Sequence, residues 1–105
     1  MAPVYLVTEA DVTDPEGYAN EFARPAQATI HAHGGRPIAV GGAGGAGAKG
    51  IKQITGAPAP ERAVIHRWES VDQLETWFNS HEYQDLLRIG EKFATFRGYV
   101  IDGIE

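Results

Sequence analysis

Four side chains in this sequence have both the chemistry and the setting expected of a small-molecule site. His66 lies in a short apolar run, where a neutral imidazole could accept or donate a proton. Tyr83 carries a hydroxyl that needs a hydrogen-bond partner if it is buried. Arg36 follows two glycines and could hold an anionic group of a substrate. We therefore predict His66 and Tyr83 as catalytic residues, and Arg36 and Trp68 as substrate-binding residues.

Each of these residues also has a purely structural interpretation. His66 could be a buried neutral histidine with one hydrogen-bond partner. Trp68 and Tyr83 belong to an aromatic set that could simply fill the core. Arg36 could form a surface ion pair of little energetic value. No Ser-His-Asp order and no pair of carboxylates can be recognised from spacing alone, so the residues by themselves do not identify a reaction.

Metal and thiol chemistry have little support in this chain. The sequence contains no cysteine, which excludes disulfides, thiolate metal sites and a cysteine nucleophile. His31 and His33 are two residues apart, so on a helix their side chains point about 200° from each other and cannot chelate one ion. We expect no metal site.

The glycine-rich tract from Gly41 to Gly50 formally contains the G-x-G-x-x-G spacing of dinucleotide-binding proteins, starting at Gly42. That motif requires a following helix whose N-terminus binds the pyrophosphate, and residues 48–56 are too short and too interrupted to form one. Lys49 does not directly follow a glycine, so the phosphate-loop pattern fails as well. We predict a mobile loop or lid here, and no nucleotide or other cofactor.

Length and composition indicate one small globular domain covering residues 1–105, with 43% hydrophobic and 22% charged residues. The net charge is −5 and the nine basic residues are scattered, so a nucleic-acid partner is not expected. The N-terminus lacks a basic region, and Thr8 and Glu9 interrupt its apolar run. We therefore expect neither a signal peptide nor a membrane span, and a cytoplasmic location.

The elements that must position the four candidates alternate between strands and helices. Patterns of period two predict strands, and apolar residues four apart predict helices. The strands are expected at residues 3–10, 36–40, 63–68 and 95–104, with a further brief strand or hairpin arm at 51–55. The helices are expected from Asp14 to about His33, after Ser70, and after Ser80. The order β-α-β-β-α-β predicts an α+β, ferredoxin-like domain, with an antiparallel sheet covered by helices on one face.

Local signals refine these helices. Thr13 or Asp14 can cap the first helix, and Pro25 should kink it or divide it in two. Ser70 and Gln73 have the spacing of a capping box, and Ser80 can cap the last helix.

Strand parity decides where His66 points. Val64, His66 and Trp68 share one face of the central strand, while Ala63, Ile65 and Arg67 share the other. A large apolar ring such as Trp68 suits a covered face, so we predict that His66 faces the helices rather than the opposite face of the sheet. There it would line the same cavity as Tyr83, which begins the helix that returns across the sheet.

Several short motifs in this order resemble a known family. The motifs are Asp11-Val12-Thr13-Asp14-Pro15, Gly34-Gly35-Arg36, Trp68-Glu69-Ser70, and Ser80-His81-Glu82-Tyr83 with Arg88. Together they resemble a family of unknown function within the dimeric α/β-barrel superfamily, which also includes antibiotic-biosynthesis monooxygenases. The resemblance implies a homodimer whose two sheets face each other, with a small cavity between sheet and helices in each subunit.

Two functions from different classes fit these observations. The first is a cofactor-independent enzyme that acts on a small organic molecule, with His66 transferring a proton, Tyr83 donating a hydrogen bond and Arg36 anchoring an anion. The alternative is a non-catalytic ligand-binding or stress-response protein that uses the same cavity. A catalyst needs at least two polar groups converging in one cavity, whereas a binding protein can manage with an apolar one.

Overall fold

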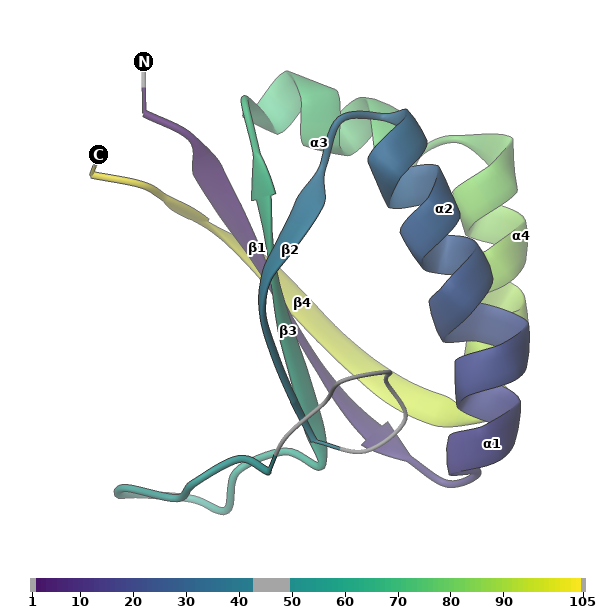
Figure 1. The fold of residues 1–105 in the computed structure, drawn as a ribbon, viewed down its shortest axis with the longest axis vertical. Coiled ribbons are helices and arrows are strands. Elements are labelled where there is room, and N and C mark those ends of the chain that lie inside the picture. The colour runs from purple at the N-terminus through teal and green to yellow at the C-terminus, as the bar shows by residue number, and fades with distance from the viewer. Residues whose placement is uncertain (1, 43–49, 105) are drawn as a thin grey trace.

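The computed structural model describes residues 2–42 and 50–104, which form a four-stranded antiparallel sheet with helices on one face (Figure 1). The strand order is β2-β3-β1-β4, as expected for a ferredoxin-like α+β domain. The sheet is open at both edges. The elements are β1 Val4–Val12, α1 Pro15–Gly17, η1 Tyr18–Ala23, α2 Arg24–Ala32, β2 Arg36–Gly42, β3 Arg62–Trp68, α3 Val71–Phe78, α4 His81–Gly90 and β4 Ala94–Asp102.

The predicted strand or hairpin arm at residues 51–55 is wrong, because that segment has no strand in the structure. The side chain of Gln53 instead binds the surrounding backbone, donating to the carbonyl oxygens of Thr55 and Ala57 and accepting from the backbone N–H of Ala59. These contacts bend residues 53–59 into a loop around the side chain of Gln53, which an extended strand could not form. The tract from Gly41 to Gly50 was predicted to be a mobile loop, but Gly41 and Gly42 end β2, where they pair with Ala63 and Arg62. Residues 43–49 lie outside the described part of the chain.

The first helical segment is continuous but irregular. Asp14 is its cap, since its carboxylate accepts a hydrogen bond of 3.1 Å from the backbone N–H of Gly17. The predicted interruption near Pro25 takes the form of a π-helix, η1, which ends at Ala23, two residues before the proline, and not of a break between two helices. The wider turn accommodates a residue that has no N–H to donate.

The caps of the last two helices are confirmed. The hydroxyl of Ser70 accepts from the backbone N–H of Gln73, and the hydroxyl of Ser80 accepts from that of Tyr83. At the start of α3, Gln73 also returns a hydrogen bond to the residues before the helix, because its side-chain oxygen accepts from the backbone N–H of Glu69. Trp77 and Tyr83 are thereby held above the sheet. None of the helices in the described residues is long and apolar enough to cross a membrane.

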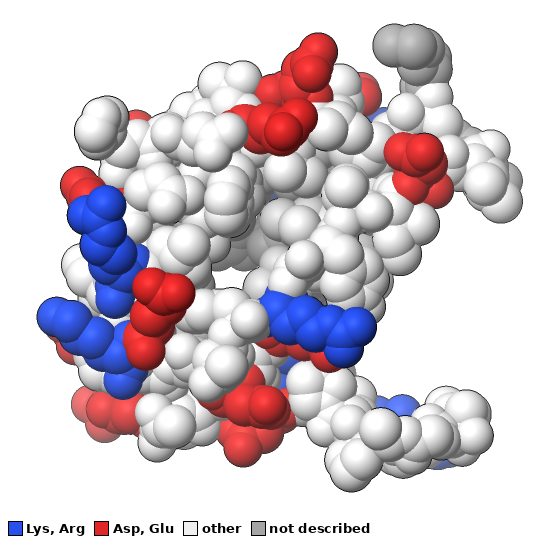
Figure 2. All heavy atoms as spheres, turned by 180° about the vertical axis from the view of Figure 1, so that it is seen from behind, with Lys and Arg blue, Asp and Glu red and all other residues white. Residues whose placement is uncertain are grey.

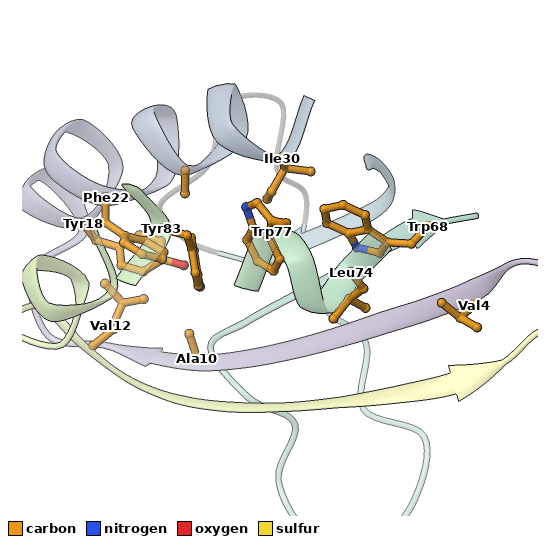
Figure 3. Close-up of a cluster of buried hydrophobic side chains, with 12 residues drawn as sticks. Val4, Ala10, Val12, Tyr18, Phe22, Ile30, Trp68, Leu74, Trp77 and Tyr83 are labelled. Carbon is orange, nitrogen blue, oxygen red and sulfur yellow. The ribbon is translucent and has the colours of Figure 1, made fainter. Parts of the chain in front are cut away.

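The hydrophobic core lies between the sheet and the helices (Figure 3). It is rich in aromatic rings, and the centroids of Trp77 and Tyr83 are 4.0 Å apart while those of Trp68 and Trp77 are 5.1 Å apart. Gly90 ends α4 directly against Phe22, where a Cβ atom would come within 2.5 Å of the phenylalanine ring. The helices can therefore pack closely on one another at that point.

No helix within residues 2–42 and 50–104 covers the other face of the sheet (Figure 1). That face holds an apolar groove of about 310 Å³ lined by Tyr5, Val7, Ile38, Ile65 and Ile101. Ile38 and Ile101 are each about half exposed, at 50% and 51%. A surface of this kind is typical of an interaction face.

Candidate active site between the sheet and the helices

Strand β3 supplies the polar groups of the candidate site. Its residues alternate strictly between buried and half-buried, and Arg62, Val64, His66 and Trp68 form the buried set. His66 binds a side chain of α2, so this set faces the helices. The predicted orientation of His66 is confirmed.

The imidazole of His66 is held in one orientation. Its Nε2 lies 3.2 Å from the side-chain oxygen of Gln27 on α2, so Nε2 donates the hydrogen bond and Nδ1 is left as the acceptor in the neutral ring. Nδ1 is buried and has no hydrogen-bond partner among the described residues. Buried polar atoms without a partner are rare in folded proteins, so Nδ1 calls for an explanation such as a catalytic role.

The surroundings of His66 favour its neutral form. Burial lowers the pKa of His66 to about 4, and the electrostatic interactions with Arg62 and His31 act in the same direction. The imidazole is therefore uncharged at neutral pH and its Nδ1 lone pair is available. This combination of burial and electrostatic field is typical of functional sites.

Arg62 is a site residue that we did not predict. It is 7% exposed and its guanidinium lies 5.5 Å from the ring centroid of Tyr18. It shares the inward face of β3 with His66, two positions away from Val64, and it is close enough to lower the pKa of His66. Strand parity was the signal that could have identified it, because Arg62, Val64 and His66 occupy every second position of the strand.

Tyr83 lies on the same side of the sheet as His66, within the aromatic core. Its ring packs on Trp77 and Phe78, with centroid distances of 4.0 Å and 5.6 Å. Burial raises the pKa of Tyr83, and the nearby Tyr18 and Glu91 raise it further, so the hydroxyl stays protonated. No hydrogen bond joins Tyr83 to His66 among the described residues, and their convergence on one ligand stays a prediction.

Trp68 and Arg36 occupy different environments. Trp68 is fully buried and stacks on Trp77, and its indole N–H has no partner in the described part of the chain. Arg36 is exposed and pairs with Arg67 across β2 and β3. Directly opposite residues of an antiparallel pair share a face, so Arg36 lies on the side of the sheet turned away from His66. The anion that Arg36 was predicted to bind would therefore not reach the imidazole.

The inward face of the sheet is more exposed at β4 than at His66. In the sheet register His66 lies opposite Leu6, and Leu6 lies opposite Val100, so these three side chains form one row on the inward face. Exposure rises along this row from 7% at His66 to 42% at Val100. Figure 2 shows the molecule from the side of β4 and α4, with a hollow near the middle of this face.

Other parts of the described structure offer fewer side chains that could take part in a reaction. A hollow of about 550 Å³ borders residues 50–61, but glycine, proline and alanine make up most of its lining. The ring of His33 lies 2.8 Å from the carbonyl oxygen of Thr29, to which its Nδ1–H donates at the end of α2. Residues 2–42 and 50–104 contain no group of three or more histidines and acidic residues placed to hold a metal ion.

Several solved structures share this fold at low sequence identity. A protein of unknown function from Rhodopseudomonas palustris is 10% identical, with a TM-score of 0.75 over 99% of this chain and 84% of its own. SnoaB, a cofactor-independent oxygenase from Streptomyces nogalater, is 12% identical, with a TM-score of 0.69 over 100% of this chain and 96% of its own. A dimeric protein of unknown function with a ferredoxin-like fold from Bacteroides fragilis is 9% identical, with a TM-score of 0.52 over 98% of each chain.

These identities are low enough that the likeness shows the fold alone. A sequence comparison with curated proteins gives no match. A family model, however, covers nearly the whole sequence, from residue 3 to residue 104, and confirms the resemblance to a family of unknown function. The chain belongs to the DUF1330 family, a domain of unknown function.

Proposed function

We propose that this protein is a cofactor-independent enzyme that transfers a proton to or from a small organic molecule bound between the sheet and the helices. One observation carries the proposal: His66 presents a buried, neutral imidazole whose Nε2 is held by Gln27 and whose Nδ1 is without a partner among the described residues. A general base needs a lone pair that is fixed in place and not already engaged.

Arg62 and Tyr83 supply the complementary roles. When a C–H or O–H bond of the ligand loses its proton to Nδ1, the ligand becomes an anion such as an enolate. The positive charge of Arg62 would stabilise that anion, and the protonated hydroxyl of Tyr83 is available as a hydrogen-bond donor. The positive charge of Arg62 lowers the pKa of His66 and so makes it a weaker base. The same charge stabilises the anion that forms when the ligand loses its proton.

The fold supports this class of function by analogy. SnoaB shows that a chain with this architecture can act as an oxygenase without a cofactor. We propose that the present protein also acts as a homodimer, because the apolar groove on the helix-free face needs a cover and a protein of the same fold is described as dimeric. Two such sheets packed face to face would form the closed barrel that a single open sheet cannot.

Proton transfer can be tested without knowing the natural substrate. Acetylacetone is a small enolisable molecule, and in D₂O its methylene protons exchange for deuterium when a base removes them. We expect the wild-type protein to accelerate this exchange above the buffer rate, and His66→Gln to lose most of the acceleration, by roughly 100-fold for a positioned general base. Proton NMR of the methylene signal gives both rates.

His81→Gln is the matched control, because His81 is exposed at the start of α4 and should not affect the exchange rate. Equal rates for wild type and His66→Gln would disprove the assignment of the base. Acetylacetone that binds near His66 without exchanging would instead favour the non-catalytic binding function.

A further inference from the structure

Gly98 is a glycine in the middle of β4 whose presence the backbone does not explain. It lies opposite Thr8 in a register with β1 that runs without interruption from Val4 to Val12. Its φ lies outside the range that favours glycine. A glycine in a strand interior weakens the strand, and it often marks a bulge or a place where another group comes close. The uninterrupted register excludes a bulge at Gly98.

Packing within the chain does not explain Gly98 either. A Cβ atom there would meet nothing closer than the carbonyl oxygen of Val7 at 3.8 Å and the side chains of Leu6 and Thr8 at 3.9 Å, which are ordinary contacts. Gly90 is the opposite case, since a Cβ atom at that position would collide with the ring of Phe22 at 2.5 Å. The described residues therefore leave room for a side chain at Gly98.

The direction of that missing side chain connects Gly98 with the candidate site. Its nearest side chains, Leu6 and Thr8, lie on the inward face of β1, so a side chain at Gly98 would point into the space between the sheet and the helices. Gly98 is exposed, and so is its inward neighbour Val100 at 42%. The hollow in Figure 2 is seen from this side of the molecule.

We propose that the missing side chain at Gly98 keeps open the entrance through which a small molecule reaches His66. This inference rests on the proposed function and adds the shape of the ligand. Its body would be apolar, because it would lie on Gly98, Leu6 and Val100. One hydrogen-bonding end would reach Nδ1 of His66, two strands away or about 10 Å at the usual strand spacing. Gly98 is then the residue that determines which ligands are admitted.

Diethyl pyrocarbonate tests this entrance without any knowledge of the ligand. The neutral imidazole attacks one of its carbonyl carbons, the C–O bond to the ethyl carbonate leaving group breaks, and the ring loses its N–H proton. Because His66 is 7% exposed and faces the helices, the reagent must pass between the sheet and the helices to reach it. We expect His66 to be modified in the wild type, and Gly98→Leu to slow the modification at least tenfold, as measured by mass spectrometry of peptides.

Three controls accompany this measurement. The exposed His31 and His81 should react at the same rate in every variant. Gly50→Leu adds the same side chain at a glycine with nothing within 4 Å, and should leave His66 as reactive as in the wild type. Gly98→Ala and Gly98→Val should fold with a melting temperature equal to or above that of the wild type, and Gly98→Val should also slow the reaction.

Four results would overturn the proposal. They are an unreactive His66 in the wild type, equal rates in the wild type and Gly98→Leu, a melting temperature several degrees lower in Gly98→Ala, and failure of both Gly98→Leu and Gly98→Val to fold. The last two would mean that the strand itself requires glycine. The modification by diethyl pyrocarbonate measures access to His66, whereas the deuterium exchange of acetylacetone measures proton transfer by His66. A blocked entrance together with absent deuterium exchange would leave the entrance established and reject the enzymatic function.

Discussion

The imidazole of His66 makes the stability of this protein depend on pH. Its pKa is about 4 in the folded protein and near 6.5 when the chain unfolds, so the unfolded state binds the proton more readily. The stabilising effect of the neutral ring is complete above pH 6.5 and is lost as the pH falls towards 4. The difference in pKa corresponds to about 3 kcal/mol in the free energy of unfolding, as an order of magnitude.

His66→Gln removes this titration, so the free energy of unfolding of the variant should change less between pH 7 and pH 4. Urea denaturation at a series of pH values, at one protein concentration, measures the difference between the two slopes. His81→Gln removes an exposed histidine and should retain the slope of the wild type. An NMR titration of His66 near its ordinary value of about 6.5 would contradict the prediction.

A second residue-scale prediction concerns the indole of Trp77. Its N–H donates to the hydroxyl of Thr29 at 2.9 Å, and that hydroxyl donates to the carbonyl oxygen of Ala26 at 2.8 Å. Thr29→Val would leave the indole N–H buried without a partner, because Trp77 is only 2% exposed. We expect the free energy of unfolding to fall by about 1–3 kcal/mol.

Thr76→Val is the matched control for this substitution. Thr76 also lies on a helix and its hydroxyl donates to a backbone carbonyl, that of Asp72, but it is exposed and supports no buried group. Its replacement should change the free energy of unfolding by less than about 0.5 kcal/mol. A similar loss in both variants would mean that the contact with Trp77 contributes nothing.

At the scale of elements, the contact of α4 with η1 depends on Gly90. Replacing a helical glycine with alanine ordinarily stabilises a helix by about 0.5–1 kcal/mol. Here the new Cβ would lie 2.5 Å from the ring of Phe22, which is itself packed against Tyr83 and Phe96 and cannot move away. Gly90→Ala should therefore destabilise the protein by about 1–3 kcal/mol. A melting temperature above that of the wild type would show that the two elements can separate without loss.

At the scale of the whole molecule, the helix-free face of the sheet should form the dimer interface. Ile101→Asp places a charge in the apolar groove and should convert a dimer to a monomer at micromolar concentration, as measured by light scattering. Ile54→Asp adds the same charge at a residue that is 80% exposed and does not line the groove, and should remain dimeric. A monomeric wild type would disprove the interface.

On the face that carries the hollow, charge is distributed without a dominant patch (Figure 2). Figure 2 shows acidic and basic residues interspersed on the face that carries the hollow. With a net charge of −5, the chain offers no extended basic surface for a polyanion on that face. A face with interspersed charges suits the entry of a small molecule better than the binding of a charged polymer.

The sequence by itself determined the element order and the direction of His66. Both depend on local regularities: the period of two along β3, the serines before α3 and α4, and the proline in the first helix. Local patterns of this kind follow from backbone geometry, which acts over a few residues. Even the π-helix before Pro25 was expected as an interruption, although its form was not.

Only the tertiary structure decided which side chains meet. His66 and Gln27 are 39 residues apart, and Trp77 and Thr29 are 48 apart, so no spacing in the sequence could pair them. The strand register placed Arg36 on the far face and brought Gly98 beside Leu6 and Thr8. Register depends on how whole faces are buried, and one residue of slip reverses every side chain. A site built across strands and helices is therefore a property of the assembled fold.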